Sequence, residues 1–294
     1  MLIRRHPIDI TQLIPDRKKD AHKGSCGRLL IIAGSCRYTG AAALMVEAAL
    51  RSGVGVVYAI ATQAVAQVIR NRTPEVVVIE VASMEGKFDK NILDDMRGAI
   101  EEYRIDAIGV GPGIGWLDHF DAFYEGLLDI IKKHQLKALV DADALAPIYQ
   151  KIIGQSMLPN HLIFTPHPKE FLRMTALESV NEINKDVLHA AKKVKQVIVY
   201  KTNATVVAND EGVWRSGTGN ESLATAGSGD VLSGIIAGFL AQGIQLVDAA
   251  KLGVYMHGLV AELASRDFGR HSLIASDLCN YIPKGFQELS QYHG

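Results

Sequence analysis

Short runs of apolar residues, many of them β-branched, recur along the chain, and each is followed by a glycine-rich or acidic turn and then by a segment with helical periodicity. Several runs are apolar at every position, which is typical of strands that are buried on both faces of a parallel sheet. The predicted strands are Arg28–Ala33, Val56–Ala61, Val76–Ile79, Ala107–Val110, Ala138–Val140, Leu162–Thr165 and Val197–Tyr200.

Helical segments separate these strands, and the alternation predicts βαβ units with right-handed crossovers in an α/β fold. The predicted helices are Gly40–Arg51, Gln63–Arg70, Asn91–Tyr103, Phe120–Lys133 and Asn184–Lys195.

The pattern changes toward the end of the chain. Thr205–Ala208 and Val213–Arg215 flank the turn-forming segment Asn209–Gly212, so we expect an antiparallel hairpin at one edge of a mostly parallel sheet. Two more helices are predicted, at Asp230–Gln242, with Gly243 as its stop, and at Val247–Phe268.

Composition narrows the function classes. The chain has 31 Lys and Arg against 32 Asp and Glu, a formal net charge of −1, so charge gives no reason to expect a nucleic-acid or membrane partner. The N-terminal segment lacks the apolar core of a signal peptide, and the longest apolar run, Val231–Ala241, is shorter than the about 20 residues of a membrane span. We therefore predict a cytoplasmic protein. No linker, charge block or repeat divides the sequence, which favours one domain over residues 1–294.

The strongest local motif is Ala224-Thr225-Ala226-Gly227-Ser228-Gly229-Asp230, which precedes an apolar helix. The glycines allow backbone N–H groups to point into one concavity, and the helix N-terminus adds partial positive charge, so the turn can hold a phosphoryl anion. Asp230 at its mouth is suited to accept a proton from a hydroxyl that attacks phosphorus. The alternative is a plain helix cap, a role that Asp fills well. Gly234 and Gly238 are expected to allow close helix–sheet packing.

Other turns follow the predicted strands at their carboxyl ends, where open α/β sheets bind ligands. Each also has a purely structural interpretation, as a packing turn, a loop cap or a polar surface turn. In one of them two prolines hold His167 on a stiff loop, and Glu170 can orient a metal-bound water or begin a helix. These turns are Gly34–Ala43, Gly109–Gly115, Asp141–Leu145, Thr165–Glu170 and Lys201–Thr205.

Several other chemistries fit the sequence less well. It contains no G-x-x-x-x-G-K-[ST] phosphate loop, no G-x-S-x-G and no H-E-x-x-H, and the glycines of Gly109–Gly115 lack the dinucleotide spacing G-x-G-x-x-G. The three cysteines form no CxxC pair, which argues against a disulfide framework or a structural zinc site.

Taken in order, the motifs resemble the ADP/ATP-dependent NAD(P)H-hydrate dehydratase family of the ribokinase-like superfamily. They extend from Lys23 to Gly243, and their order is far more specific than any one of them. The resemblance implies a ribokinase-like three-layer α/β/α fold with an antiparallel edge hairpin. The motifs are KGSCGRLLIIAGSCRYTGAAALMVEAALRSGVG, VGPGIG, VDADAL, TPHPKE and GNESLATAGSGDVLSGIIAGFLAQG.

The resemblance also implies an activity. The family removes water from (6S)-NADHX or NADPHX, the hydrated forms of the reduced nicotinamide cofactors, and restores NADH or NADPH. A nucleotide donates a phosphoryl group; we expect ADP, released as AMP and phosphate, rather than ATP. Mg²⁺ is the expected metal.

Residue assignments follow from the matching motif positions. Asp230 is the predicted catalytic base. The hydrated cofactor is expected to contact Ala41, Gly113, His167 and Asp230, and Mg²⁺ is expected near Glu170 through a water. Lys169 and Thr202 stand where the family pattern has glycine. The predicted nucleotide site comprises Lys201, Thr202, Asn203, Ala204, Thr205, Asn220, Ala226, Gly227, Ser228 and Gly229.

Two alternatives remain open at this point. A small-molecule kinase of the same fold, for a vitamin or a sugar, would place its base in the same turn, and a non-catalytic regulator would bind nucleotide without turnover. The family resemblance further implies a homo-oligomer, with a tetramer as one form. About twenty residues precede Lys23, so we expect no N-terminal epimerase domain and a functional partnership with a separate NAD(P)H-hydrate epimerase.

Overall fold

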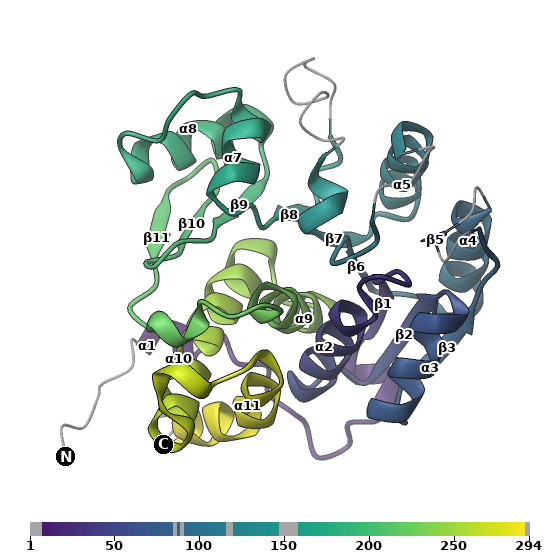
Figure 1. Ribbon diagram of the computed structural model, residues 1–294, viewed down its shortest axis with the longest axis horizontal. Helices are drawn as coiled ribbons and strands as arrows, with labels where there is room; N and C mark the ends of the chain where they lie inside the picture. Colours follow the sequence, from purple (N-terminus) through teal and green to yellow (C-terminus); the bar gives the residue numbers. More distant parts are fainter. Residues whose placement is uncertain (1–7, 85–86, 89–90, 116–119, 147–157, 292–294) are drawn as a thin grey trace.

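A nine-stranded sheet runs through the computed structural model, which describes residues 8–84, 87–88, 91–115, 120–146 and 158–291 (Figure 1). The strand order is β11-β10-β9-β8-β7-β6-β1-β2-β3. Pairing is parallel from β3 to β9 and antiparallel at β9–β10 and β10–β11. The strands are β1 (Arg28–Ile32), β2 (Val56–Ala61), β3 (Val77–Glu80), β6 (Ala107–Val110), β7 (Lys137–Val140), β8 (Leu162–Phe164), β9 (Val197–Tyr200), β10 (Val206–Ala208) and β11 (Val213–Arg215).

Helices cover both faces of the sheet, because the strands are apolar on both sides. Along β1, Leu29 and Ile31 join one core and Leu30 and Ile32 the other. The first face carries α2 (Thr39–Arg51), α3 (Gln63–Arg72), α9 (Ser228–Ala241), α10 (Leu246–Ser272) and α11 (Ala275–Ser290). The second carries α4 (Ile92–Tyr103), α5 (Phe120–His134), α7 (Pro168–Thr175) and α8 (Ile183–Val194). The predicted three-layer fold is confirmed.

Short elements complete the described chain. They are α1 (Ile8–Thr11), the 3₁₀ turns η1 (Lys23–Cys26), η2 (Ala142–Leu145) and η3 (Glu221–Leu223), and a small separate pair of strands, β4 (Ser83–Met84) and β5 (Lys87–Phe88). No helix in the described ranges is long and apolar enough to cross a membrane.

Every predicted strand is present, with ends that differ by at most one residue. The predicted hairpin is also confirmed, since Val206 pairs with Arg215 and Ala208 with Val213. The sequence analysis missed α7 and α11. Pro283 lies inside α11, where it removes a backbone donor and hides the helical pattern.

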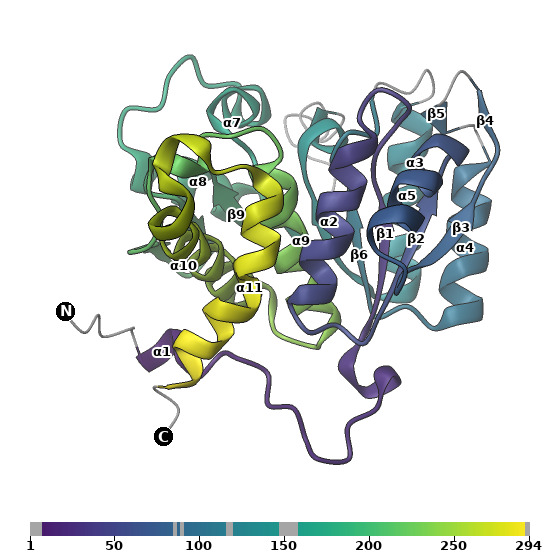
Figure 2. The same ribbon diagram turned by 60° about the horizontal axis from the view of Figure 1, so that its bottom comes forward.

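Helices α2 and α9 pack so closely that two glycines of α9 lie against the backbone of α2. A Cβ at Gly234 would lie 2.3 Å from the Met45 carbonyl oxygen, and one at Gly238 would lie 3.0 Å from that of Ala49. The expectation that these glycines serve helix–sheet packing is therefore wrong, because they admit the backbone of α2 instead. Figure 2 shows α2, α9 and α11 side by side on this face.

The turns that follow the parallel strands are joined to one another at the carboxyl edge of the sheet. The Gly34 amide donates to the Pro112 carbonyl at 2.8 Å, and the Lys201 amide donates to the Pro166 carbonyl at 2.9 Å. The Asp141 amide donates to the Val110 carbonyl at 3.0 Å and the Thr165 amide to the Val140 carbonyl at 3.3 Å, which connects the two pairs of turns along one edge. The motifs that lie far apart in the sequence thus share one edge, as the sheet topology requires.

Candidate active site

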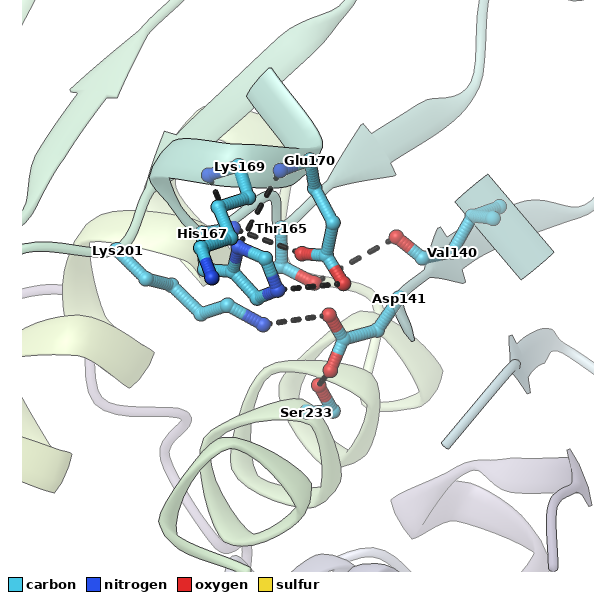
Figure 3. A network of polar contacts seen from close by, with 8 residues as sticks. All are labelled: Val140, Asp141, Thr165, His167, Lys169, Glu170, Lys201 and Ser233. Atoms are coloured by element: carbon cyan, nitrogen blue, oxygen red, sulfur yellow. Dashed lines mark hydrogen bonds and ion pairs between the residues drawn. The ribbon is translucent and has the colours of Figure 1, made fainter. Parts of the chain in front are cut away.

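A buried ion pair lies at the centre of this edge (Figure 3). The Lys201 ammonium, at the end of β9, is 2.6 Å from Asp141 Oδ1, at the end of β7. Ser233 in α9 donates its hydroxyl to Asp141 Oδ2 at 2.7 Å. One carboxylate therefore ties two strand ends to the helix that carries the predicted base.

Asp141 is held in its charged form. It is 1% exposed, so burial alone would raise the pKa of its carboxyl. The Lys201 ammonium and the hydroxyls of Ser233 and Thr165 outweigh that effect and hold the pKa below its ordinary value. Asp141 is thus a fixed negative charge that orients the lysine.

Asp230 lies in the first turn of α9 and is half-buried. Burial, with the negative charges of Asp141 and Asp143, raises the pKa of Asp230 to about 6, although the Lys201 ammonium opposes the rise. A carboxylate with this pKa is still ionised at neutral pH and is a stronger base than an ordinary aspartate.

The N-terminus of α9 leaves its first amides without a side-chain cap. Its N-cap is Gly227, with φ of 86°, a left-handed conformation that favours glycine. A Cβ at Gly227 would come within 2.6 Å of Leu44 Cδ1, so the turn also lies tight against α2. A Cβ at Gly229 would lie 3.6 Å from Lys201 Nζ. The predicted anion cradle, the predicted base and the lysine therefore face one another.

His167 and Glu170 form a closed pair at the start of α7. His167 Nδ1 accepts hydrogen bonds from the Lys169 and Glu170 amides at 3.1 and 3.2 Å, so its ring proton belongs on Nε2, which lies 3.3 Å from Glu170 Oε1. Glu170 Oε2 accepts from the His167 amide at 2.8 Å. Burial raises the pKa of Glu170, while Lys201 opposes this. Any metal contact of Glu170 must use lone pairs left over from this capping box.

The predicted substrate residues Ala41 and Gly113 lie against each other. A Cβ on Gly113 would come within 2.9 Å of the Ala41 Cβ, so only glycine lets the turn after β6 approach the start of α2 so closely. The Ser35 hydroxyl fixes this turn by donating to the Gly113 carbonyl at 2.8 Å. The Gly115 amide donates to Asp143 at 3.0 Å, which links the turn to the carboxylates around Asp230.

The predicted nucleotide residues fall into two groups. Lys201–Thr205 and Ala226–Gly229 adjoin the ion pair, from the end of β9 and the start of α9. Asn220 lies farther back, where its amide donates to Ser265 and its oxygen accepts from the Ser222 amide at 3.0 Å. The Asn220 side chain is thus engaged within the protein.

The sequence analysis missed the buried residues that hold Lys201 in position. It treated Asp141 as an acidic residue at a strand end that either faces a metal–phosphate site or caps a loop. It gave no role to Ser233, whose position one turn after Asp230 was the available clue. Thr165 was noticed only as part of the His-Pro motif, although its buried hydroxyl, which donates to the Val140 carbonyl at 3.5 Å, also helps to lower the pKa of Asp141.

The donor set suits a hydrated magnesium ion. Glu170, Asp230 and Asp143 bring negative charge close to Lys201. Burial is the main cause that raises the pKa values of Glu170 and Asp230, and the charge of Asp141 adds to it, while Lys201 opposes the rise. Mg²⁺ typically keeps several waters and takes one or two carboxylates. Within the described ranges, no three His, Cys, Asp or Glu side chains converge to form a direct metal site, so contact through water is the mode that this arrangement suits.

Solved structures define the class of protein. A ribokinase-like superfamily protein of Enterococcus faecalis superposes with a TM-score of 0.82 at 24% identity, covering 96% of this chain and 94% of that one. Its likeness bears on the fold alone. The ADP/ATP-dependent NAD(P)H-hydrate dehydratase of Bacillus subtilis, co-crystallised with ATP and Mg²⁺, superposes with a TM-score of 0.76 at 30% identity, covering 95% and 96%. The fold class is therefore ribokinase-like.

Sequence comparisons narrow the class to one family. The family model described as NAD(P)H-hydrate dehydratase matches residues 29–284. The ADP-dependent (S)-NAD(P)H-hydrate dehydratase of Bacillus subtilis is 35% identical over 279 residues, 92% of this chain and 93% of that protein. The bifunctional NAD(P)H-hydrate repair enzyme of Dictyoglomus turgidum is 35% identical over 276 residues, 92% of this chain and 52% of the relative. The chain spans about half the length of such bifunctional relatives. It belongs to the NAD(P)H-hydrate dehydratase family.

Proposed function

We propose that this enzyme converts (6S)-NADHX and NADPHX back to NADH and NADPH, with ADP as the phosphoryl donor and AMP and phosphate as the other products. The observation that carries the proposal is the half-buried Asp230 carboxylate at the uncapped start of α9, facing the Lys201–Asp141 pair. It supplies a base and an anion site next to each other, which phosphoryl transfer to a hydroxyl requires.

The chemistry explains why a dehydration needs a nucleotide. Hydroxide is a poor leaving group, because the pKa of water is about 15.7. Transfer of the β-phosphoryl group of ADP to the C6 hydroxyl forms a C6 phosphate ester and AMP. The lone pair of the ring nitrogen then expels phosphate from C6, and loss of a proton from C5 restores the C5–C6 double bond.

Asp230 takes the proton from the C6 hydroxyl as that oxygen attacks phosphorus. Its raised pKa strengthens it as a base while leaving it ionised at neutral pH. The position of Asp230 in the first turn of α9 keeps the base within one helical turn of the amides that receive the transferred group.

The first-turn amides of α9 and the Lys201 ammonium stabilise charge on the phosphoryl oxygens. Asp141 keeps that ammonium in place, because it holds Lys201 Nζ at 2.6 Å. When bound, Mg²⁺ would neutralise phosphate charge, and Glu170 would hold it through a water. On the substrate side, Ala41, Gly113 and His167 would border the hydrated nicotinamide.

The deciding experiment incubates the purified protein with NADHX, Mg²⁺ and either ADP or ATP. Recovery of nicotinamide absorbance together with release of free phosphate supports the proposal, and the faster nucleotide identifies the donor. Omission of nucleotide, and addition of excess EDTA, should each abolish recovery. If the protein instead yields a stable phosphorylated product from an alcohol, or binds nucleotide without turnover, the proposal is wrong.

Other features stay predictions. They are the single domain over residues 1–294, the preference between NADHX and NADPHX, the cytoplasmic location, and a homo-oligomer such as a tetramer. A separate NAD(P)H-hydrate epimerase would supply the (6S) form from the other epimer, so coupled assays with both epimers of NADHX test that partnership.

A further inference from the structure

Helix α10 lies alongside the segment that leads into α9. The Thr218 hydroxyl donates to the Tyr255 carbonyl at 2.8 Å, and the Gly219 amide donates to Glu262 at 2.8 Å. A Cβ on Gly258 would come within 2.4 Å of Thr218 Oγ1, so glycine is needed for this approach. The supporting residues recur three or four positions apart, on one face of the helix. They are Tyr255, Gly258, Glu262 and Ser265.

The same helix reaches the far end of that segment through His257. Its Nε2 lies 3.2 Å from the hydroxyl of Ser228, the first residue of α9. His257 is 7% exposed and Ser228 is 6% exposed, so water does not compete for this contact. Ser228 is two residues from the predicted base Asp230. The contact therefore fixes the backbone of the turn whose amides form the anion cradle.

Burial also sets the charge of His257. It lowers the pKa of the imidazole to about 4, with the Lys201 ammonium acting in the same direction and contact with the Ser228 backbone opposing it. The ring is therefore neutral at physiological pH. A neutral imidazole anchors the turn without adding a cation that would compete with Lys201 for the phosphoryl group.

We propose that His257 is a positioning residue for phosphoryl transfer, acting through the Ser228 hydroxyl to hold the first turn of α9, and with it Asp230, in the geometry of reaction. The inference rests on the proposed function. It assigns a role to a buried residue outside the predicted substrate and nucleotide positions. Small displacements of reacting groups lower turnover strongly, because proximity is a large part of catalysis.

A double-mutant cycle tests whether His257 acts through Ser228. We expect His257→Leu and Ser228→Ala each to lower kcat about tenfold, the value of roughly one hydrogen bond. The double variant should be no slower than the slower single variant, because both changes break the same contact. Effects that multiply to about a hundredfold would show independent action and overturn the proposal.

Rescue and binding measurements separate positioning from folding. His257→Gln places an amide nitrogen near the position of Nε2 and should restore kcat to within about threefold of the parent. Calorimetric Kd values for ADP with Mg²⁺ should stay within about threefold of the parent in His257→Leu and His257→Gln, so that the loss falls on kcat. His189→Gln, on the exposed side of α8, is the matched control and should change neither constant. Failure of His257→Gln to rescue a folded protein would count against positioning.

A spectroscopic test holds even if the parent shows no dehydratase turnover, in which case only the proposed function fails. With ¹⁵N-labelled histidine, and the His257 signal identified by its loss in His257→Gln, the ring should stay neutral from pH 8 to pH 5. Its resonance should move on Ser228→Ala and on addition of ADP with Mg²⁺. A ring that titrates near 6.5, or that ignores both changes, would overturn the anchoring contact.

Discussion

Helices α7 and α9 both begin beside the Lys201–Asp141 ion pair, but a side chain caps the first amides of α7 and none caps those of α9. At α7, the His167 ring accepts hydrogen bonds from the Lys169 and Glu170 amides, and Glu170 returns a bond to the His167 backbone. At α9, the N-cap is Gly227, which has no side chain to offer. Each helix start carries the same partial positive charge, yet only α9 leaves its amides for a ligand.

The two helix starts follow similar turns that are rich in glycine or proline, but the presence or absence of a side-chain cap suits them to different functions. The start of α7 uses its amides to fix an imidazole, so the ring is held in one position, as our proposed contact with the substrate requires. The start of α9 presents backbone donors and a base, so it suits a phosphoryl anion. If this comparison holds, changes at α9 should cost turnover, whereas changes at α7 should cost stability and substrate affinity.

The largest expected effect comes from removing the base at α9. Asp230→Asn should lower kcat by about 10²–10⁴-fold, the usual contribution of a general base, with ADP affinity near the parental value. Steady-state kinetics with NADHX and calorimetry with ADP check the two parts. A variant that turned over at the parental rate would remove Asp230 from the mechanism.

Asp248→Asn provides the matched control for that variant. Asp248 also lies in the first turn of a helix, α10, so its loss removes the same helix-start charge away from the ion pair. We expect parental kcat. A comparable loss in Asp248→Asn would mean that the Asp230 effect reflects helix stability rather than proton transfer.

Loss of the Lys201–Asp141 ion pair should lower both the free energy of unfolding and the rate of turnover. Lys201→Met leaves the buried Asp141 carboxylate without its cation and should lower the free energy of unfolding by about 3 kcal/mol. Because Lys201 holds the Asp141 pKa down, its loss lets that carboxyl take up a proton as pH falls. The deficit should therefore be largest at neutral pH and shrink on acidification.

The double variant Lys201→Met/Asp141→Asn separates the effect on stability from the effect on activity. The neutral pair should recover most of the stability in urea denaturation but little of the activity, since the ammonium that faces the α9 cradle is still missing. Equal recovery of both would show that Lys201 is only a structural partner of Asp141.

The dependence of kcat/KM on pH tests the proposed base at the start of α9, with a smaller expected effect than the substitutions above. The pKa of Asp230 is raised to about 6, and its ionised form is the active one, so kcat/KM should fall below pH 6 by about tenfold per pH unit. Lys201 opposes the rise of this pKa, so Lys201→Met should move the break to higher pH. A profile that stays flat down to pH 5 would contradict the assignment of the base.

The fold was predictable because it depends on patterns within short segments. Apolar runs of three to six residues, each followed by a turn and a helical period, specify buried parallel strands, and the described strands match them. Helix α11 was not predictable in this way, since Pro283 interrupts its pattern and tertiary packing overrides the local preference. Gly234 and Gly238 were recognised as packing positions, but the identity of the packed partner, α2, is a property of the assembled fold.

The site was predictable only in part, for the same reason. Asp230 and the glycines before it form a motif that local chemistry explains. The pairing of Asp141 with Lys201 joins residues 60 positions apart, and the contact of His257 with Ser228 joins residues 29 apart. Nothing in either short segment specifies its partner. Such contacts depend on strand order and helix packing, which the residue pattern predicts only as a class.

The smallest expected effect tests the α7 side of the comparison. His167→Ala removes the acceptor for two amides and should cost about 1 kcal/mol of unfolding free energy, as loss of an N-cap usually does. His167→Asn keeps a short side-chain acceptor at the cap, so its stability in urea should match that of the parent. Both variants lose the imidazole and should raise KM for NADHX by about tenfold, the value of roughly one hydrogen bond. If His167→Asn kept the parental KM, the ring would serve only to cap α7; if both variants instead lowered kcat as far as Asp230→Asn does, the division of labour between the two helix starts would be wrong.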